Sequence, residues 1–170
     1  MKTFGFMKTQ HLFLALAASL LTTMAQAQQT LSDLVQEANA GWLIGSWKAT
    51  TDEGGTFDLS FSWDLDKHVI LLHGKGDDFE FKGFSALEPG SDEVSYVGFD
   101  SRGAVSKGKW ALENNDLVLR VETRTEERTW KMAAVFASAA GGGLNLRLHP
   151  LDEWGNLVTP EQTLLRFKKV

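Results

Sequence analysis

Three histidines that follow the first 27 residues, His68, His73 and His149, are the first candidates for chemistry, because imidazole binds metal ions and transfers protons. A metal site needs three or four ligands that converge on one point. His68 and His73 are separated by an odd number of positions, so on one straight strand they face opposite sides. We therefore expect no metal site, and His149 stays open only as a single axial ligand for haem.

Carboxylates are concentrated in the first half of the chain, between positions 52 and 80. Paired catalytic carboxylates need buried surroundings that separate their pKa values. Asp58 and Asp64 instead alternate with apolar residues, which predicts that both face solvent. No serine lies in the Gly-x-Ser-x-Gly pattern of a nucleophile. The sequence thus predicts no catalytic residue, and whether the protein is an enzyme stays open, with the balance against it.

The composition excludes several classes of protein. The chain has 170 residues and no cysteine, so disulfide scaffolds, thiolate metal sites and cysteine nucleophiles are ruled out. A net charge of -5 disfavours nucleic-acid binding, which requires a basic face. Six tryptophans and eleven phenylalanines are many for one domain. Side chains of this size need a large apolar interior, a ligand or a partner.

The first 27 residues have the pattern of a secretory signal peptide. Lys2 and Lys8 precede an apolar run at 12–21, and Ala25-Gln26-Ala27 provides the small residues of a cleavage site. The apolar run is shorter than the roughly 20 residues of a membrane-spanning helix. We therefore expect cleavage after Ala27, export to the bacterial periplasm or medium, and no stable membrane span in the mature chain.

The segment 28–41 is predicted to contain one short N-terminal helix, at 31–40. Its apolar residues recur at helical spacing, and Thr30 or Ser32 could cap its first turn. Gly41 follows the last turn, where a glycine commonly adopts the left-handed conformation that ends a helix.

The remainder, 42–170, is predicted to be one domain made of strands. The clearest strand is 57–64, where apolar and polar residues alternate without a break. The predicted strands are 42–50, 57–64, 68–73, 79–85, 94–99, 104–112, 117–123, 129–136, 144–148 and 163–168. Short turns join them and no helix separates them, so neighbouring strands must be antiparallel. Because closure removes exposed sheet edges, we predict an all-β, up-and-down antiparallel β-barrel of about ten strands, with the helix at one end.

The alternation also predicts which side chains face the interior of this barrel. A barrel of this size is wide enough to hold one small ligand, and binding pockets are commonly lined by aromatic side chains. The predicted ligand-binding residues are Phe61, Trp63, Phe81, Tyr96, Trp110, Trp130, Met132 and Leu146. The alternative is an interior that the same side chains fill completely, and the sequence leaves both possibilities open.

A motif at the start of the strand region, Trp42-Leu43-Ile44-Gly45-Ser46-Trp47, resembles that of small bacterial lipocalin-like barrels. The Gly-x-Trp core of the motif is similar to the first-strand motif of lipocalins and the wider calycin group, which includes fatty-acid-binding proteins. The resemblance implies an antiparallel barrel with an apolar pocket. It also implies that Gly45 and Trp47 close one barrel end, with Arg166 of the last strand packed on the indole.

Haem-binding nitrobindin-like barrels share the Gly-x-Trp start but continue with two further glycines. Here Lys48-Ala49-Thr50 follows Trp47, so the resemblance does not extend to the haem-binding pattern, and we expect no cofactor. The leading hypothesis is an exported barrel that binds a small hydrophobic molecule. The alternative is an accessory module of the cell envelope with a solid barrel, which contacts a protein partner through Trp154 in the loop 150–160.

Overall fold

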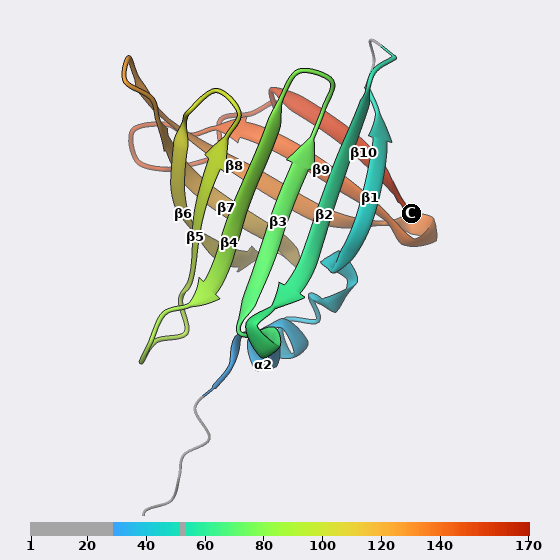
Figure 1. The fold of residues 1–170 in the computed structure, drawn as a ribbon, viewed down its shortest axis with the longest axis vertical. Helices are drawn as coiled ribbons and strands as arrows, with labels where there is room; N and C mark the ends of the chain where they lie inside the picture. The colour runs from blue at the N-terminus through green and yellow to red at the C-terminus, as the bar shows by residue number, and fades with distance from the viewer. Residues whose placement is uncertain (1–28, 52–53) are drawn as a thin grey trace, which may run out of the picture.

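The computed structural model describes residues 29–51 and 54–170, and within them ten antiparallel strands form a closed barrel (Figure 1). Each strand pairs with its neighbours in the chain, and β1 pairs with β10 to complete the circle. The strands are β1 Gly45–Thr50, β2 Thr56–Asp64, β3 Val69–Lys75, β4 Glu80–Leu87, β5 Val94–Asp100, β6 Val105–Glu113, β7 Asp116–Arg124, β8 Thr129–Ala139, β9 Gly143–Pro150 and β10 Thr163–Lys169. The predicted up-and-down barrel with a short N-terminal helix is confirmed.

The first strand begins later than the alternation predicted. Gly41–Leu43 forms a short 3-10 helix, and β1 starts only at Gly45. Gly45 has a φ of 138°, a backbone conformation that side chains disfavour. The glycine therefore allows the chain to leave the 3-10 turn and enter the barrel.

The helix α2, Leu31–Glu37, is shorter than predicted because the left-handed residue that follows it is Asn39 and not Gly41. Thr30 caps its first turn in a capping box, one of the two predicted caps. At the other end Asn39 takes the left-handed conformation, with a φ of 50°. The amides of Asn39 and Ala40 then bond back to the carbonyls of Gln36 and Val35, which is the Schellman arrangement.

The core lies inside the barrel, and α2 covers one of its ends (Figure 1). Leu31 of α2 and Leu43 of the 3-10 turn are both buried in the same hydrophobic cluster as the inward side chains of the strands. We call this the α2 end, and we call the opposite end, formed by the turns 76–79, 101–104 and 125–128, the far end. The barrel interior therefore has one end covered by a helix.

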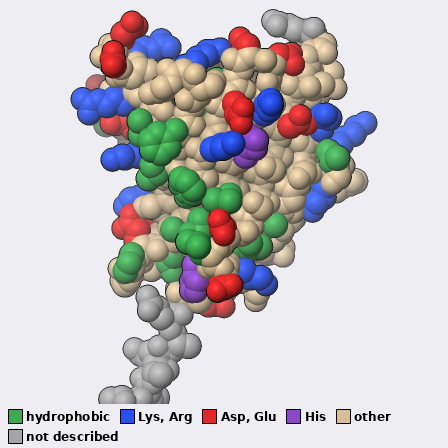
Figure 2. Space-filling model, in the orientation of Figure 1, with side chains coloured by type: hydrophobic (Ala, Val, Ile, Leu, Met, Phe, Trp, Pro, Cys, Tyr) green, Lys and Arg blue, Asp and Glu red, His purple; other side chains and the backbone are tan. Residues whose placement is uncertain are grey.

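The outer surface is not uniformly polar. The loop 151–162 folds back over β7 to β9, where Leu151 and Leu157 pack against the buried outward side chains of Val118, Ala133 and Val135. Figure 2 shows a second group of hydrophobic side chains over β4 and β5. Phe84 and Phe99, on the outer face of these two strands, have 51% and 54% of their surface exposed.

The predicted signal peptide, residues 1–27, lies outside the described residues. Within 29–51 and 54–170, none of the helices has the length and apolar character needed to cross a membrane.

Candidate functional site

The Trp47 indole closes the barrel at the α2 end. It is 2% exposed, and its Nε1 donates a hydrogen bond to the Leu43 carbonyl at 2.9 Å. The cation over its ring is Lys169, whose Nζ lies 5.1 Å from the ring centroid. Arg166, which the lipocalin resemblance placed there, is exposed on the outer face of β10 opposite Asn145. Phe167 faces the core, and side chains alternate along a strand, so Lys169 lies on the same side as Phe167 and reaches the indole while Arg166 points away.

A cavity of about 350 Å³ occupies the far end of the barrel, and we call it the far-end cavity. Its boundary is almost entirely aromatic and aliphatic. Five of the predicted ligand-binding residues line it, namely Phe81, Tyr96, Trp130, Met132 and Leu146. Inward residues from eight strands complete the lining, among them Phe57, Leu72, Leu119, Val121, Ala134, Phe136, Leu148 and Leu165.

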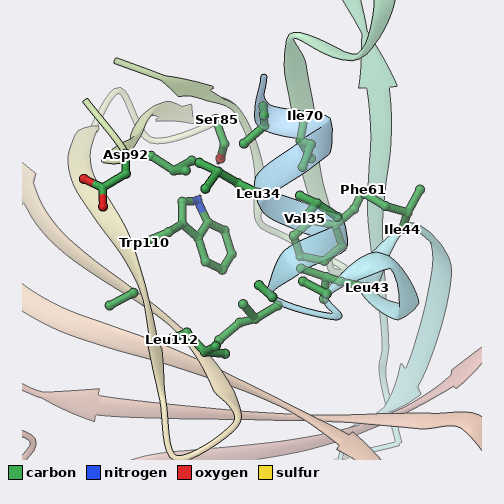
Figure 3. Close-up of a pocket in the computed structure, with 16 residues that line it drawn as sticks. Leu34, Val35, Leu43, Ile44, Phe61, Ile70, Ser85, Asp92, Trp110 and Leu112 are labelled. Atoms are coloured by element: carbon green, nitrogen blue, oxygen red, sulfur yellow. Dashed lines mark hydrogen bonds between the residues drawn. The ribbon is translucent and has the colours of Figure 1, made fainter. Parts of the chain in front are cut away.

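A smaller cavity of about 250 Å³ lies between α2 and the strands, and we call it the α2-end cavity (Figure 3). Leu34 and Val35 of the helix face Trp110 across it. Phe61 also lines this cavity. Trp63, the last of the predicted ligand-binding residues, lines neither cavity, and it packs against the core from a position opposite Ile70.

Three aromatic rings separate the two cavities. The Phe136 ring packs edge to face on the Phe61 ring, with 5.6 Å between their centroids. The centroid of the Trp110 ring lies 5.4 Å from that of Phe136. Trp110 is fixed by a hydrogen bond from its Nε1 to the Ser85 hydroxyl, at 2.8 Å. Because Phe136 lines the far-end cavity while Phe61 and Trp110 line the other, this layer divides the interior into two compartments.

Inward-facing glycines shape the wall of the far-end cavity. A Cβ built on Gly83 would lie 2.4 Å from the Tyr96 ring, and one on Gly98 would lie 2.2 Å from the Tyr96 hydroxyl. On β3, a Cβ on Gly74 would lie 2.1 Å from the Phe81 ring. The rings of Tyr96 and Phe81 therefore lie flat against the wall, in space that other residues would fill. Sequence reasoning missed these glycines, although glycine inside a strand marks a close approach of other atoms.

The polar groups of the far-end cavity are few. Ser106 and Thr123 are hydrogen-bonded to each other, with 2.8 Å between their hydroxyl oxygens. Burial raises the pKa of Tyr96 to about 12, so its phenol stays uncharged. Asp100 also lines the cavity, and its Oδ1 accepts hydrogen bonds from the amides of Arg102 and Ala104, both at 2.9 Å.

Two arginines stack on aromatic rings at the rim of this cavity. The guanidinium of Arg102 lies 5.2 Å from the centroid of the Phe79 ring, and that of Arg128 lies 4.8 Å from the centroid of Trp130. Both Phe79 and Trp130 line the cavity. The cations thus lie over the rings of two lining residues, which is a stabilising arrangement for partly buried aromatic rings.

The histidines lie outside both cavities. His149 is on the outer face of β9, buried under the loop 151–162, and its Nδ1 lies 3.0 Å from the Val158 carbonyl oxygen. His73 is on the outer face of β3, with its Nε2 2.8 Å from the Glu80 carboxylate. The hydrogen bond to His73 holds the pKa of Glu80 below its usual value. Among the residues that the structure describes, no cluster of three or more potential metal ligands is found.

The chain matches no model of a known protein family. A search of curated proteins likewise found no similar chain. The closed, all-antiparallel barrel of ten strands is consistent with a calycin-type fold. The lipocalin-like motif at 42–47 therefore stands as a resemblance, and the candidate function depends on the interior of the barrel.

Proposed function

We propose that this protein binds a small hydrophobic molecule in the far-end cavity, after export to the periplasm or the medium. One observation carries the proposal: an apolar cavity of about 350 Å³ lies inside a barrel whose opposite end is closed by α2 and Trp47. Ligand sites are typically concave, mostly apolar and above about 300 Å³.

The lining supports the same proposal. A fully packed core leaves few voids larger than a water molecule, because each unfilled volume forfeits dispersion contacts. Here large rings such as Phe81 and Tyr96 are laid along the wall over glycines instead of pointing into the centre. The inward side chains thus border a space that an apolar ligand would fill.

The experiment is a titration with the fluorescent hydrophobic probe N-phenylnaphthylamine, using wild type and a variant in which the cavity is filled. Ala134 lines the far-end cavity, so Ala134→Phe places a ring in the ligand space. Ala137→Phe is the matched control, since Ala137 is on the outer face of the same strand, opposite Asn145. We expect Ala134→Phe to weaken binding about tenfold or more, equivalent to at least about 1.4 kcal/mol. Equal affinity in both variants would contradict binding in this cavity.

Export is tested separately. Fractionation of bacteria that express the full chain should place the protein in the periplasm or the medium, with Gln28 as its first residue. Recovery of an uncleaved chain from the cytoplasm would contradict export and would leave the ligand proposal to its own test.

A second candidate function has its own observation. Trp154 is 78% exposed in the loop 151–162, and an exposed indole is a typical anchor for a protein partner. A pull-down from envelope extracts should lose its partner with Trp154→Ala and keep it with Leu65→Ala. Leu65 is 67% exposed at the α2 end and serves as the matched control. A partner retained by Trp154→Ala would exclude this candidate.

A further inference from the structure

Four inward-facing residues on neighbouring strands form one row across the wall of the far-end cavity. Gly83 of β4 is opposite Gly98 of β5, Gly98 is opposite Ser106 of β6, and Ser106 is opposite Thr123 of β7. Opposed residues of antiparallel strands have Cα atoms about 4.5–5.5 Å apart. The Tyr96 hydroxyl lies over both glycines, since a Cβ on Gly83 or Gly98 would be 2.5 or 2.2 Å from it. Three hydroxyl groups therefore gather on adjacent strands at one level of the cavity.

These hydroxyls have hydrogen-bonding capacity that the fold does not use. Tyr96 is 5% exposed, and its hydroxyl has no hydrogen-bond partner among residues 29–51 and 54–170. Ser106 and Thr123 bond to each other, which occupies one donor and leaves the second hydroxyl proton available. A ligand oxygen inside the cavity gains a hydrogen bond from these unused positions, and a pure hydrocarbon does not.

The charges around the cavity select against an anion. Arg102 and Arg128 stack on lining rings at the rim, but no lysine, arginine or histidine is among the described residues that line the cavity. The one charged side chain in the lining is the Asp100 carboxylate. A buried carboxylate without a cation is strongly disfavoured and must take up a proton instead. The Tyr96 phenol is uncharged at neutral pH and cannot compensate for a negative ligand.

We propose that the ligand of the far-end cavity is an uncharged amphiphile, with an apolar body and one hydroxyl or carbonyl oxygen. Tyr96, Ser106 and Thr123 bind that oxygen, and the body lies against rings such as Phe81 and Trp130. This inference rests on the proposed function, and it adds the chemical class of the ligand and the residues that select it.

The first test compares decanol with decanoate as competitors for N-phenylnaphthylamine at neutral pH. Decanol should bind about tenfold more tightly or better, because the acid must lose its charge to enter. Lowering the pH toward the pKa of the free acid should raise the affinity for the acid and leave that for the alcohol unchanged. Equal affinities at neutral pH would overturn the inference.

The second test removes single hydroxyls. Tyr96→Phe keeps the ring over the glycines and should reduce decanol affinity about fivefold, the usual worth of one hydrogen bond. Ser106→Ala should also weaken decanol binding, while the control Ser62→Ala, at an exposed position on the outer face of β2, should not. Binding of the hydrocarbon naphthalene should be the same in all three variants, and thermal unfolding should show that each is folded.

The outcomes separate the two proposals. If naphthalene binding is blocked by Ala134→Phe but Tyr96→Phe leaves decanol affinity unchanged, the neutral-oxygen site is excluded and the hydrophobic cavity stands. If wild type binds neither the probe nor naphthalene, the proposed function fails, and this inference fails with it.

Discussion

Each end of the barrel has a tryptophan with a cation over its ring, but the two tryptophans differ in their surroundings. At the α2 end, Trp47 is buried and its Nε1 donates a hydrogen bond to the Leu43 carbonyl. Lys169 lies over its ring. At the far end, Trp130 is only partly buried, has Arg128 over its ring and borders the cavity. The same residue type therefore completes the core at one end and lines a cavity at the other.

The difference shows what a covering element does. At the α2 end, Leu31 and Leu43 cover the inward side chains, and the cavity beneath the helix measures about 250 Å³. Among the described residues, no helix covers the far end, and glycines on β3, β4 and β5 further widen the interior there. We expect substitutions at the α2 end to change mainly stability, and substitutions at the far end to change mainly binding.

The largest expected effect on stability is that of Trp47→Ala. Removing a fully buried aromatic side chain and its hydrogen bond should lower the free energy of unfolding by about 3–5 kcal/mol. Urea denaturation followed by circular dichroism measures the loss. Trp154→Ala is the control, because an indole that is 78% exposed should contribute less than about 0.5 kcal/mol. Similar losses in the two variants would remove the distinction between a closing and an exposed tryptophan.

Gly83→Ala tests the wall of the far end. The added Cβ would lie 2.4 Å from the Tyr96 ring, so the ring must leave its place against the sheet and enter the cavity. We expect a loss of about 1–3 kcal/mol in stability and weaker binding of the hydrophobic probe. In Tyr96→Ala the same glycine substitution should cost much less, and a double-mutant cycle measures this coupling. Additive effects would contradict the assigned contact.

Thr30→Ala should have a smaller effect, confined to the α2 end. The Thr30 hydroxyl accepts a hydrogen bond from the Asp33 amide in the first turn of the helix, and its loss should cost about 1 kcal/mol. Hydrogen exchange should speed up in α2, and probe binding at the far end should not change. Ser32→Ala is the control, because Ser32 was the other predicted cap and does not fill that role. Equal effects of the two substitutions would contradict the assigned cap.

The smallest effect is expected for Glu113→Gln, in the pair that joins β6 to β7. The hydrogen bond from Arg120 lowers the pKa of Glu113, and Arg120 Nη2 lies 3.0 Å from its Oε2. Because this pKa is lower in the folded than in the unfolded state, the ionised carboxylate stabilises the fold at pH values above the unfolded pKa of about 4.3. This stabilisation is lost as the pH falls through the folded-state pKa. Because both side chains are about one-third exposed, solvent screening limits the contribution to less than about 1 kcal/mol.

Urea denaturation at several pH values measures the effect. Wild type should exceed Glu113→Gln in stability at neutral pH, and the two should converge in acid. A difference that grows on acidification would have the wrong sign for this ion pair.

Strand number, antiparallel order and closure could be predicted from the sequence, because alternation and short turns leave little choice of topology. The inward positions of Phe81, Tyr96 and Met132 also follow from alternation within their strands. The partner of Trp47 could not be predicted in this way. A shift of one residue in β10 would exchange the faces of Arg166 and Lys169. The pairing of Trp47 with Lys169 between β1 and β10 determines that Lys169 reaches the indole.

The sequence by itself determined a single all-β barrel, since period-two alternation with short turns is a local property that each segment carries alone. Only the tertiary structure decided which inward side chains would fill space and which would border it. That outcome depends on long-range pairings: Gly83 with Gly98 beside Tyr96, and Ser106 with Thr123 across the cavity wall. A cavity is the volume that packing leaves over, so it exists only once all ten strands and α2 are in place.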